Sequence, residues 1–224
     1  MLNDKRIRII SGHYGSGKTE FSINYAIKLA EMKKNVAIVD LDVVNLYFRS
    51  REKEDFLKEK GIRVIGSSIR AASLDVPSIS SQASITFHDE SLETIIDLGG
   101  NPEGARALAR YNEYLREGYY DMFFVLNANR PETRSLDDVM KFIVKIQDVV
   151  RGKFTGIVNN THMLKATSVD DILKGYDLAK KASDLTGIPI KYNAGLESVL
   201  NKIQSKLEGE MFPINLYMRE EWMV

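Results

Sequence analysis

Residues 12–19 read Gly-His-Tyr-Gly-Ser-Gly-Lys-Thr, which matches the pattern G-x-x-x-x-G-K-[ST] of a phosphate-binding loop, or P-loop. A short run rich in β-branched residues, 6–10, precedes the loop and predicts a strand. After the loop, apolar residues recur at helical spacing, at Phe21, Tyr25, Ala26, Leu29 and Ala30. A strand, a glycine-rich loop and a helix in this order form the context in which the motif binds phosphate. The stretch therefore predicts a site for a nucleoside triphosphate.

The residues of this loop have distinct expected roles. Gly12, Gly15 and Gly17 allow the backbone to approach an anion closely, so that N–H groups converge on it. A helix that begins near Lys18 adds the positive end of its dipole. We expect Lys18 to reach the β- and γ-phosphates and to act in catalysis, and the Thr19 hydroxyl to ligate Mg²⁺. The expected nucleotide-binding set is completed by the neighbouring residues His13, Tyr14, Ser16 and Glu20.

Two other nucleotide fingerprints do not fit the chain. The dinucleotide pattern G-x-G-x-x-G fails because Gly15 and Gly17 are followed by residues 18–20, which hold no third glycine. The guanine-reading pattern N-K-x-D fails because residues 201–204 read Asn-Lys-Ile-Gln and lack the acid. We therefore favour a nucleoside triphosphate over NAD or FAD, and ATP over GTP.

Composition narrows the class of protein. The chain has 224 residues, of which 44% are hydrophobic and 28% charged, as in ordinary globular proteins. Lys plus Arg and Asp plus Glu both number 31, so net charge gives no general attraction to nucleic acid or anionic membranes. The absence of cysteine excludes disulfides, thiolate metal sites and cysteine nucleophiles. No apolar stretch is long enough for a membrane span and the N-terminus lacks a signal-peptide core, so we expect a cytoplasmic location.

Short apolar runs alternate with helical patterns along the chain. Strands are predicted at 6–10, 36–39, 62–65, 94–97, 122–126, 154–158 and, as the last strand, 188–192. Helices are predicted after the P-loop and over 51–60, 104–117, 136–144, 169–179 and 195–208, with a loop holding one short helix at 66–91. This alternation predicts an α/β three-layer sandwich, a mainly parallel sheet flanked by helices, in one domain over 1–224. A C-terminal tail is expected at about 209–224, with its aromatic residues packed on the domain or on a second subunit.

Acidic residues end two of the predicted strands, at the edge where ligands bind in parallel sheets. Asp97 is followed by Gly100, a spacing in which the acid holds Mg²⁺ through water and the glycine N–H meets the γ-phosphate. Asp40 and Asp42 would share one face of an extended segment, with Asp40 near the metal and Asp42 orienting the attacking water. The alternative for all three acids is turn and capping chemistry after a strand. Arg130 follows another buried strand and could line the same crevice.

Taken together, the P-loop at 12–19, Val-Asp-Leu-Asp at 39–42 and Ile-Asp-Leu-Gly-Gly at 96–100 resemble the MinD/ParA/CobQ group of SIMIBI-class P-loop ATPases. The resemblance covers residues 5–200 and extends to a bacterial branch of nucleotide-binding proteins in that group. It implies ATP, Mg²⁺ and a homodimer that closes around two nucleotides. Residues 154–160 are similar to the group's strand that ends in an adenine-contacting asparagine, for which Asn160 is favoured over Asn159. An asparagine-rich turn is the alternative reading of both.

Two neighbouring positions depart from the group's pattern. His13 stands where the group has a signature lysine that reaches across the dimer, and Tyr14 stands where glycine is usual. The sequence therefore predicts nucleotide binding. It does not decide whether the chain forms the sandwich dimer.

Such a site is compatible with three functions. The favoured one is a MinD/ParA-like ATPase that acts as a nucleotide-dependent switch on a protein partner whose identity the sequence does not give. A small-molecule kinase or amide-forming ligase of the CobB/dethiobiotin-synthetase type is the alternative, but the candidate acceptor loops lack a dense Arg/Lys set. A metallocentre maturation ATPase would need paired cysteines, which the chain does not have.

Overall fold

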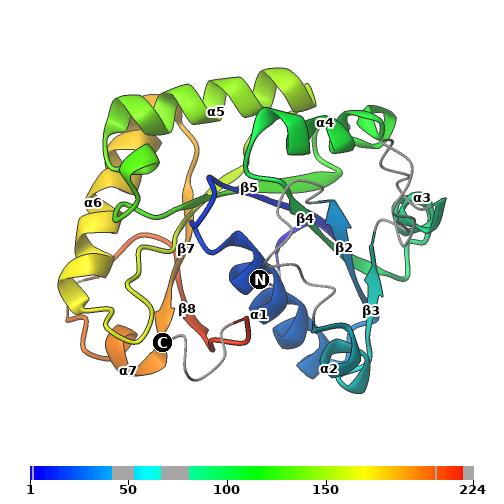
Figure 1. The fold of residues 1–224 in the computed structure, drawn as a ribbon, viewed down its shortest axis with the longest axis horizontal. Helices are drawn as coiled ribbons and strands as arrows, with labels where there is room; N and C mark the ends of the chain where they lie inside the picture. Colours follow the sequence, from blue (N-terminus) through cyan, green and yellow to red (C-terminus); the bar gives the residue numbers. More distant parts are fainter. Residues whose placement is uncertain (2, 42–52, 67–80, 205, 219–224) are drawn as a thin grey trace, which may run out of the picture.

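A computed structural model describes residues 1, 3–41, 53–66, 81–204 and 206–218. Within them, helices cover both faces of one parallel sheet, which confirms the predicted three-layer α/β sandwich (Figure 1). The strands are β1 (Ile7–Ser11), β2 (Val36–Leu41), β3 (Ile62–Ile65), β4 (Glu93–Leu98), β5 (Tyr120–Leu126), β6 (Gly156–Asn159), β7 (Ile190–Leu196) and β8 (Glu210–Ile214). The α-helices are α1 (Lys18–Glu31), α2 (Glu54–Glu59), α3 (Ser81–His88), α4 (Pro102–Ala109), α5 (Leu136–Val150), α6 (Val169–Thr186) and α7 (Glu197–Leu200). Two short 3-10 helices, η2 (Asn112–Tyr114) and η3 (Pro131–Thr133), flank β5.

The strand order β3-β2-β4-β1-β5-β6-β7-β8 places β1 in the interior of the sheet. β1 pairs with β4 on one side and β5 on the other, and every pairing between the described strands is parallel. The chain therefore leaves β1 at a point where neighbouring connections run in opposite directions, which is where open α/β sheets bind ligands. In the same register, Asp40 of β2 lies directly beside Asp97 of β4.

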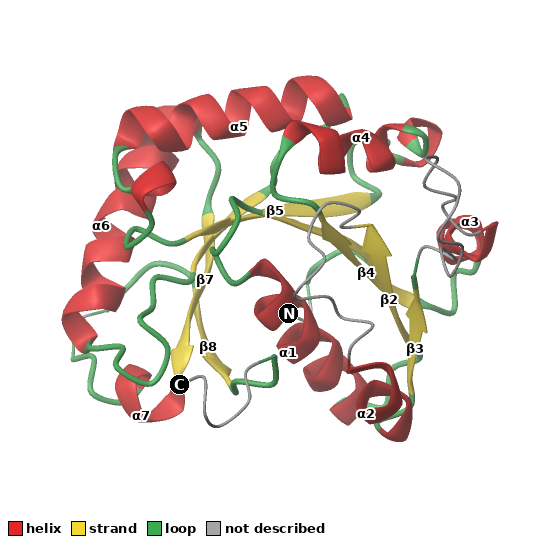
Figure 2. Cartoon of the chain, in the orientation of Figure 1, coloured by secondary structure: helices red, strands yellow, loops and turns green. Residues whose placement is uncertain are grey.

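The sheet separates two apolar cores. One core joins the sheet to α4, α5 and α6 through residues such as Leu108, Ile143 and Ala179. The other joins it to α1 and α2, and Figure 2 shows these helices on the opposite side of the sheet from α4 and α5. Phe21 of α1 is fully buried there, with its ring centroid 4.8 Å from that of Phe212 in β8. Helix α1 and the C-terminal strand are therefore packed against each other in one core.

Local sequence signals account for several helix ends. The Ser168 hydroxyl accepts a hydrogen bond from the Asp171 N–H while the Asp171 carboxylate accepts from the Ser168 N–H, which forms a capping box at the start of α6. Gly187 ends α6 in the left-handed conformation at φ 76°. Ser135 caps α5 by accepting from the Asp138 N–H at 3.2 Å.

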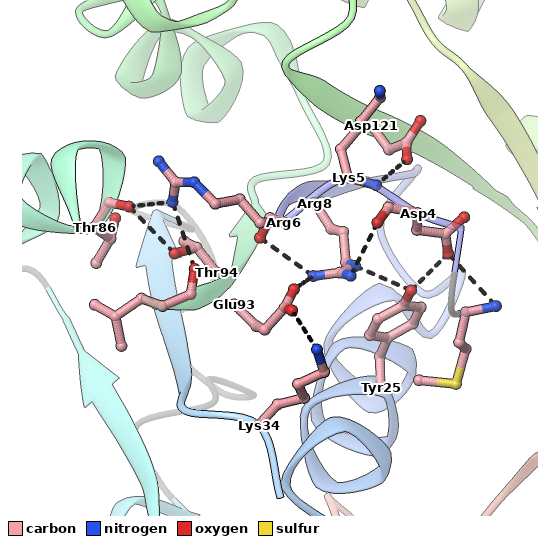
Figure 3. A network of polar contacts seen from close by, with 12 residues as sticks. Asp4, Lys5, Arg6, Arg8, Tyr25, Lys34, Thr86, Glu93, Thr94 and Asp121 are labelled. Atoms are coloured by element: carbon pink, nitrogen blue, oxygen red, sulfur yellow. Dashed lines mark hydrogen bonds and ion pairs between the residues drawn. The ribbon is translucent and has the colours of Figure 1, made fainter. Parts of the chain in front are cut away.

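A polar network lies at the end of β1 and α1 opposite the P-loop (Figure 3). The buried Arg8 guanidinium donates to Tyr25 Oη at 3.0 Å and to Glu93 Oε2 at 2.7 Å. The Tyr25 hydroxyl donates to Asp4 Oδ2 at 2.6 Å, and the Tyr192 hydroxyl donates to the same oxygen. These bonds tie β1, β4, β7 and the middle of α1 together, so the strand and the helix that flank the P-loop are held to each other away from the loop.

The structure corrects the bounds of two helices predicted from periodicity. The helix expected over 104–117 begins at Pro102 and ends at Ala109, because Asn101 caps it and the next turns form 3-10 bonds such as Tyr114 N–H to the Tyr111 carbonyl. The helix expected over 195–208 is only the four-residue α7, because β7 continues to Leu196.

The strand expected to be last is followed by β8, which pairs with β7 inside the segment expected to be a tail. Pro213 lies within β8, and proline is tolerated there because β8 has a neighbouring strand on one side only. Among the described residues, no helix is both long enough and apolar enough to cross a membrane.

Candidate functional site

The loop between β1 and α1 has the conformation that its glycines predict. Gly15 and Gly17 have φ values of 77° and 82°, in the left-handed region that glycine adopts without strain. Gly17 is the N-cap of α1, and a Cβ atom there would lie 3.0 Å from His162 Nε2 and inside contact distance of the Asn160 amide. A glycine is therefore required at this position for two independent reasons, backbone conformation and space.

Gly100 packs directly against the same loop. A Cβ atom at Gly100 would lie 2.5 Å from the Gly12 carbonyl oxygen and 2.9 Å from the Tyr14 nitrogen. The turn after β4 thus lies against the backbone of the P-loop. Its role toward a γ-phosphate stays a prediction.

The P-loop forms one side of a pocket of about 280 Å³. The pocket is lined on this side by the backbone and side chains of Tyr14, Gly15, Gly17, Lys18 and Thr19. Its other walls come from the loops after β5 and β6, from the end of β7, and from the last residue of β8 with the segment that follows it. Apolar side chains dominate these walls, namely Leu164, Leu196, Ile214, Leu216 and Met218. A polar, amide-rich side and an apolar side in one pocket suit a ligand that has an anionic part and a flat aromatic part.

Ionisable side chains are buried where the strands end beside the loop. Lys18 and Asp40 are each 4% exposed and Asp97 is fully buried. The Ser22 hydroxyl, one turn into α1, lies 3.5 Å from Asp97 Oδ1. Lys18 lines the pocket, whereas Asp40 and Asp97 lie side by side at the ends of β2 and β4 and are not among its lining residues. Their role at a metal stays a prediction, and Asp42 lies outside the described residues.

The donor set fits Mg²⁺ held together with a phosphate. Within the described ranges, no group of three or more His, Asp or Glu side chains is arranged as a protein-only metal cage. Mg²⁺ is commonly bound by one or two protein oxygens together with phosphate oxygens and waters. The Thr19 hydroxyl and the carboxylates of Asp40 and Asp97 are the groups that would supply the protein oxygens.

Several buried polar atoms around the loop have no hydrogen-bond partner among the described residues. They are Ser11 Oγ, Ser16 Oγ, Asn127 Nδ2 and Asn160 Oδ1. Buried polar atoms in folded proteins are almost always hydrogen-bonded, to protein or to bound molecules. Their concentration around the P-loop favours a polar ligand at this place.

The two candidate asparagines after β6 have different surroundings. Asn160 lines the pocket, and its Nδ2 donates to the Ser16 carbonyl at 2.8 Å. Asn159 does not line the pocket, because its Nδ2 donates to the Ile172 carbonyl at 2.9 Å and to Asn193 Oδ1 at 3.2 Å. Asn160 is thus the asparagine placed to meet a ligand, with its Oδ1 buried and available as an acceptor.

His13 is directed away from the pocket. Its ring lies edge-on to Phe142 of α5 at 6.0 Å between centroids, and its Nδ1 is 4.0 Å from Glu132 Oε2. It does not line the pocket, whereas its neighbour Tyr14 does and is 58% exposed. In this chain, Tyr14 rather than His13 is the side chain of the loop that faces open solvent at the pocket.

Glu20 has a function that sequence reasoning missed. Its Oε1 accepts a hydrogen bond from the Tyr217 N–H at 2.6 Å, and its Oε2 accepts from the Met218 N–H at 3.1 Å. One turn later, Asn24 exchanges two 2.8 Å hydrogen bonds with the backbone of Asn215. Glu20 and Asn24 therefore hold the segment after β8 against α1, and Leu216 and Met218 of this segment line the pocket together with Ile214, the last residue of β8. The spacing of two between these three residues is the sequence signal that could have revealed an extended segment with one face on a ligand.

The loop after β5 is held from two sides. The Ala128 N–H donates to Thr161 Oγ1 at 3.0 Å, and Asn129 Nδ2 donates to Asp171 Oδ1 at 2.7 Å. Burial alone would raise the pKa of Asp171, but hydrogen bonds from Ser168 and from Asn129 lower it below its usual value. Asp171 is therefore a carboxylate at neutral pH and anchors the loop that carries Arg130.

Comparisons with known proteins agree with this geometry. The family model described as the CobQ/CobB/MinD/ParA nucleotide binding domain matches residues 7–194. No curated protein is significantly similar to the chain in sequence.

Solved structures with a similar fold include FtsY proteins from two bacteria. FtsY from Mycoplasma mycoides has 18% identity and a TM-score of 0.56, over 85% of this chain and 60% of that one. Cell division protein FtsY from Thermotoga maritima has 22% identity and a TM-score of 0.54, over 83% of this chain and 60% of that one.

A third similar structure is the signal recognition particle receptor FtsY from Elizabethkingia anophelis in complex with GDP. It has 15% identity and a TM-score of 0.52, over 84% of this chain and 57% of that one. The chain thus spans about three fifths of the length of these FtsY chains. At sequence identities this low, the structural similarity to FtsY shows a common fold and nothing beyond it.

Proposed function

The chain belongs to the CobQ/CobB/MinD/ParA nucleotide-binding domain family, and from that premise we propose that it binds ATP with Mg²⁺ and hydrolyses it as a nucleotide-dependent switch. The observation that supports this most is the P-loop itself. Its positive-φ glycines, the start of α1 and the buried Lys18 and Thr19 all border one pocket. Such a loop offers converging N–H groups, a helix dipole and a lysine to a polyphosphate.

The apolar walls of the pocket support adenine over guanine as the base. A guanine site needs an acceptor for the N1–H and N2–H groups, and proteins supply it with a carboxylate. Among the described lining residues the only carboxylate is Glu20, whose two oxygens accept backbone N–H groups of Tyr217 and Met218. Asn160 Oδ1 can accept from the adenine amino group. Since one FtsY of similar fold contains GDP, competition of ATP and GTP for the site is the direct test. Displacement by GTP at the same concentration as ATP would contradict the choice of adenine.

For hydrolysis, we propose that Thr19, Asp40 and Asp97 hold Mg²⁺ and that Lys18 stabilises charge on the phosphates. Mg²⁺ would neutralise charge that develops on the transferred phosphoryl group. The proposed role of Asp42 in orienting water rests on the sequence pattern alone. Gly12, His13, Ser16 and Gly100 are not among the residues that line the pocket, and we propose that they meet the phosphates through their backbone N–H groups.

The switch is tested against the kinase or ligase alternative by mass and by phosphate release. Light-scattering mass would be recorded without nucleotide, with ADP–Mg²⁺ and with ATP–Mg²⁺. A doubling of mass specific to ATP supports a switch that works through a homodimer. A constant mass, with phosphate release only after a metabolite is added, would contradict the switch and support group transfer. A cytoplasmic location and an as yet unidentified protein partner are part of the same proposal.

A further inference from the structure

We infer that Arg130 is a phosphate-contacting residue of the pocket, a cation supplied by the loop after β5 in addition to Lys18. The inference rests on the proposed function, because it needs a polyphosphate at the P-loop. Four observations carry it: the position of the guanidinium on the loop, its place in the pocket wall, its charge environment and the fixed conformation of its own loop.

The guanidinium of Arg130 lies against the P-loop backbone. Its Nε donates to the Gly15 carbonyl at 2.9 Å. A Cβ atom built on Gly15 would lie 3.0 Å from Nε and 3.2 Å from Cζ of Arg130. Any side chain at Gly15 would therefore displace the guanidinium, so the glycine serves the arginine as well as the turn.

This contact leaves most of the guanidinium available. Arginine has five N–H donors, and the bond to Gly15 uses the one on Nε. Arg130 also lines the pocket beside Gly15, Gly17 and Lys18. The four N–H groups on the terminal nitrogens can thus meet phosphate oxygens in the bidentate manner for which arginine is suited.

The charge of Arg130 is not neutralised by a neighbouring acid among the described residues. The acid two residues later, Glu132, lies 4.0 Å from His13 Nδ1, and Asp171 accepts from Asn129 and Ser168. No ion pair joins Arg130 to a carboxylate in the described part of the chain. A half-buried cation without an acidic partner, at the border of a P-loop pocket, is electrostatically complementary to a polyphosphate.

Arg130 is also held in place before any ligand binds. Its N–H donates to the Asn127 carbonyl at 3.1 Å, and its own carbonyl accepts from the Thr133 N–H at 3.1 Å. The Thr133 hydroxyl donates to the Asn127 carbonyl at 2.7 Å, which closes the turn. Because the backbone and Nε are already fixed, binding phosphate costs little further ordering.

The test uses three substitutions that separate charge from hydrogen bonding. Arg130→Ala removes both, Arg130→Gln keeps a neutral N–H donor for the Gly15 carbonyl, and Arg130→Lys keeps the charge. Arg134→Ala is the matched control, because Arg134 is an exposed arginine close by in the connection to α5. Affinities for ATP, ADP and AMP with Mg²⁺ would be measured by calorimetry and by competition with a fluorescent ATP analogue.

For the Ala and Gln variants, ATP and ADP binding is expected to weaken about tenfold to a hundredfold, the range of hydrogen bonds to charged groups. AMP binding should change by less than about twofold, because AMP lacks the phosphates that the loop holds. The Lys variant should fall between the Ala variant and the wild type, and Arg134→Ala should match the wild type.

Two results would overturn the inference while leaving the proposed function intact. One is wild-type affinity for ATP in Arg130→Gln, which would mean that Arg130 only braces the loop through the Gly15 carbonyl. The other is an equal loss of ATP, ADP and AMP binding in Arg130→Ala, which would place its effect outside the polyphosphate. Failure of the proposed function looks different, since the wild type itself would then bind ATP no better than Lys18→Ala does.

Discussion

The Glu20 carboxylate, in the first turn of the P-loop helix, accepts a hydrogen bond from the Tyr217 backbone N–H at 2.6 Å, across 197 positions of the sequence. The helix that would hold the phosphates therefore also holds the segment that forms an apolar wall of the pocket. In the proposed function, phosphate binding and base binding are therefore connected through one helical turn.

This connection predicts the effect of Glu20→Gln on ATP binding. A carboxamide offers one acceptor oxygen in place of two and carries no charge, so at least one of the bonds to residues 217 and 218 is lost. We expect the free energy of unfolding to fall by about 1–2 kcal/mol. ATP affinity should fall about tenfold or more as the wall loosens. Glu31→Gln, at the exposed last residue of α1, is the control and should change neither quantity. A Glu20→Gln protein with unchanged affinity would show that the wall does not contact the nucleotide.

Two glycines with positive φ, one in the P-loop and one at the end of α6, form a matched pair for substitution. Gly17 and Gly187 have φ values of 82° and 76°, but only Gly17 has atoms close to the position of a Cβ. Gly187→Ala should lower the free energy of unfolding by about 1–2 kcal/mol and leave ATP binding intact. Gly17→Ala should abolish ATP binding, because the added methyl group also meets Asn160 and His162. Calorimetric titration and thermal melts of both variants check this, and ATP binding by Gly17→Ala would be inconsistent with the loop geometry.

Removal of the charge at Asp97 is expected to affect the metal dependence of binding. In Asp97→Asn, Mg²⁺ should no longer strengthen ATP binding, and phosphate release should fall about tenfold or more, as for loss of a charged ligand. Asp121→Asn is the control, because Asp121 is buried at the opposite end of β5, where it accepts from the Lys5 N–H at 2.7 Å and from Thr155. It should reduce stability without changing the Mg²⁺ dependence. Wild-type Mg²⁺ dependence in Asp97→Asn would remove Asp97 from the metal site.

The network in Figure 3 predicts how stability depends on pH. Burial would raise the pKa of Asp4, but hydrogen bonds from Tyr192, Tyr25 and Lys191 lower it below the usual 3.8. Because the folded pKa is lower than the unfolded one, the carboxylate stabilises the fold above pH 3.8, and this stabilisation is lost as the pH falls through the folded pKa. Asp4→Asn should therefore cost about 1–3 kcal/mol at pH 7, a difference from the wild type that shrinks in acid.

Chemical unfolding of wild type and Asp4→Asn at pH 7 and at the lowest pH that keeps both folded would measure that difference. Asp184→Asn is the control, since Asp184 pairs at 2.7 Å with Lys180 in an exposed i,i+4 bridge. Such a pair contributes about 0.5 kcal/mol or less. A stability difference for Asp4→Asn that is independent of pH would contradict the assignment of a charged Asp4.

The sequence predicted the parts of the site that depend on local patterns. The P-loop motif and the positions of Asp40 and Asp97 at the ends of neighbouring strands follow from short patterns and from the rule that parallel strands end at one edge. The alternation of apolar runs and helical periods was enough for the three-layer fold.

The parts that the sequence missed depend on contacts across the chain. β8 has only five residues and includes Pro213, so local propensity favoured a tail, although pairing with β7 makes it a strand. The contact of Glu20 with the C-terminal backbone and that of Arg130 with Gly15 join segments about 200 and 115 residues apart. Periodicity within one segment carries no information about such pairs.

In the proposed function, the backbone and Lys18 of the P-loop bind the polyphosphate of ATP. Calorimetric titration of ATP–Mg²⁺ into the wild type, Lys18→Ala and Lys34→Ala tests it most directly, because Lys34 is an exposed lysine paired with Glu93 far from the loop. We predict one ATP per chain for the wild type and for Lys34→Ala, and an affinity about tenfold or more weaker for Lys18→Ala. Equal affinity of Lys18→Ala and the wild type would contradict the account.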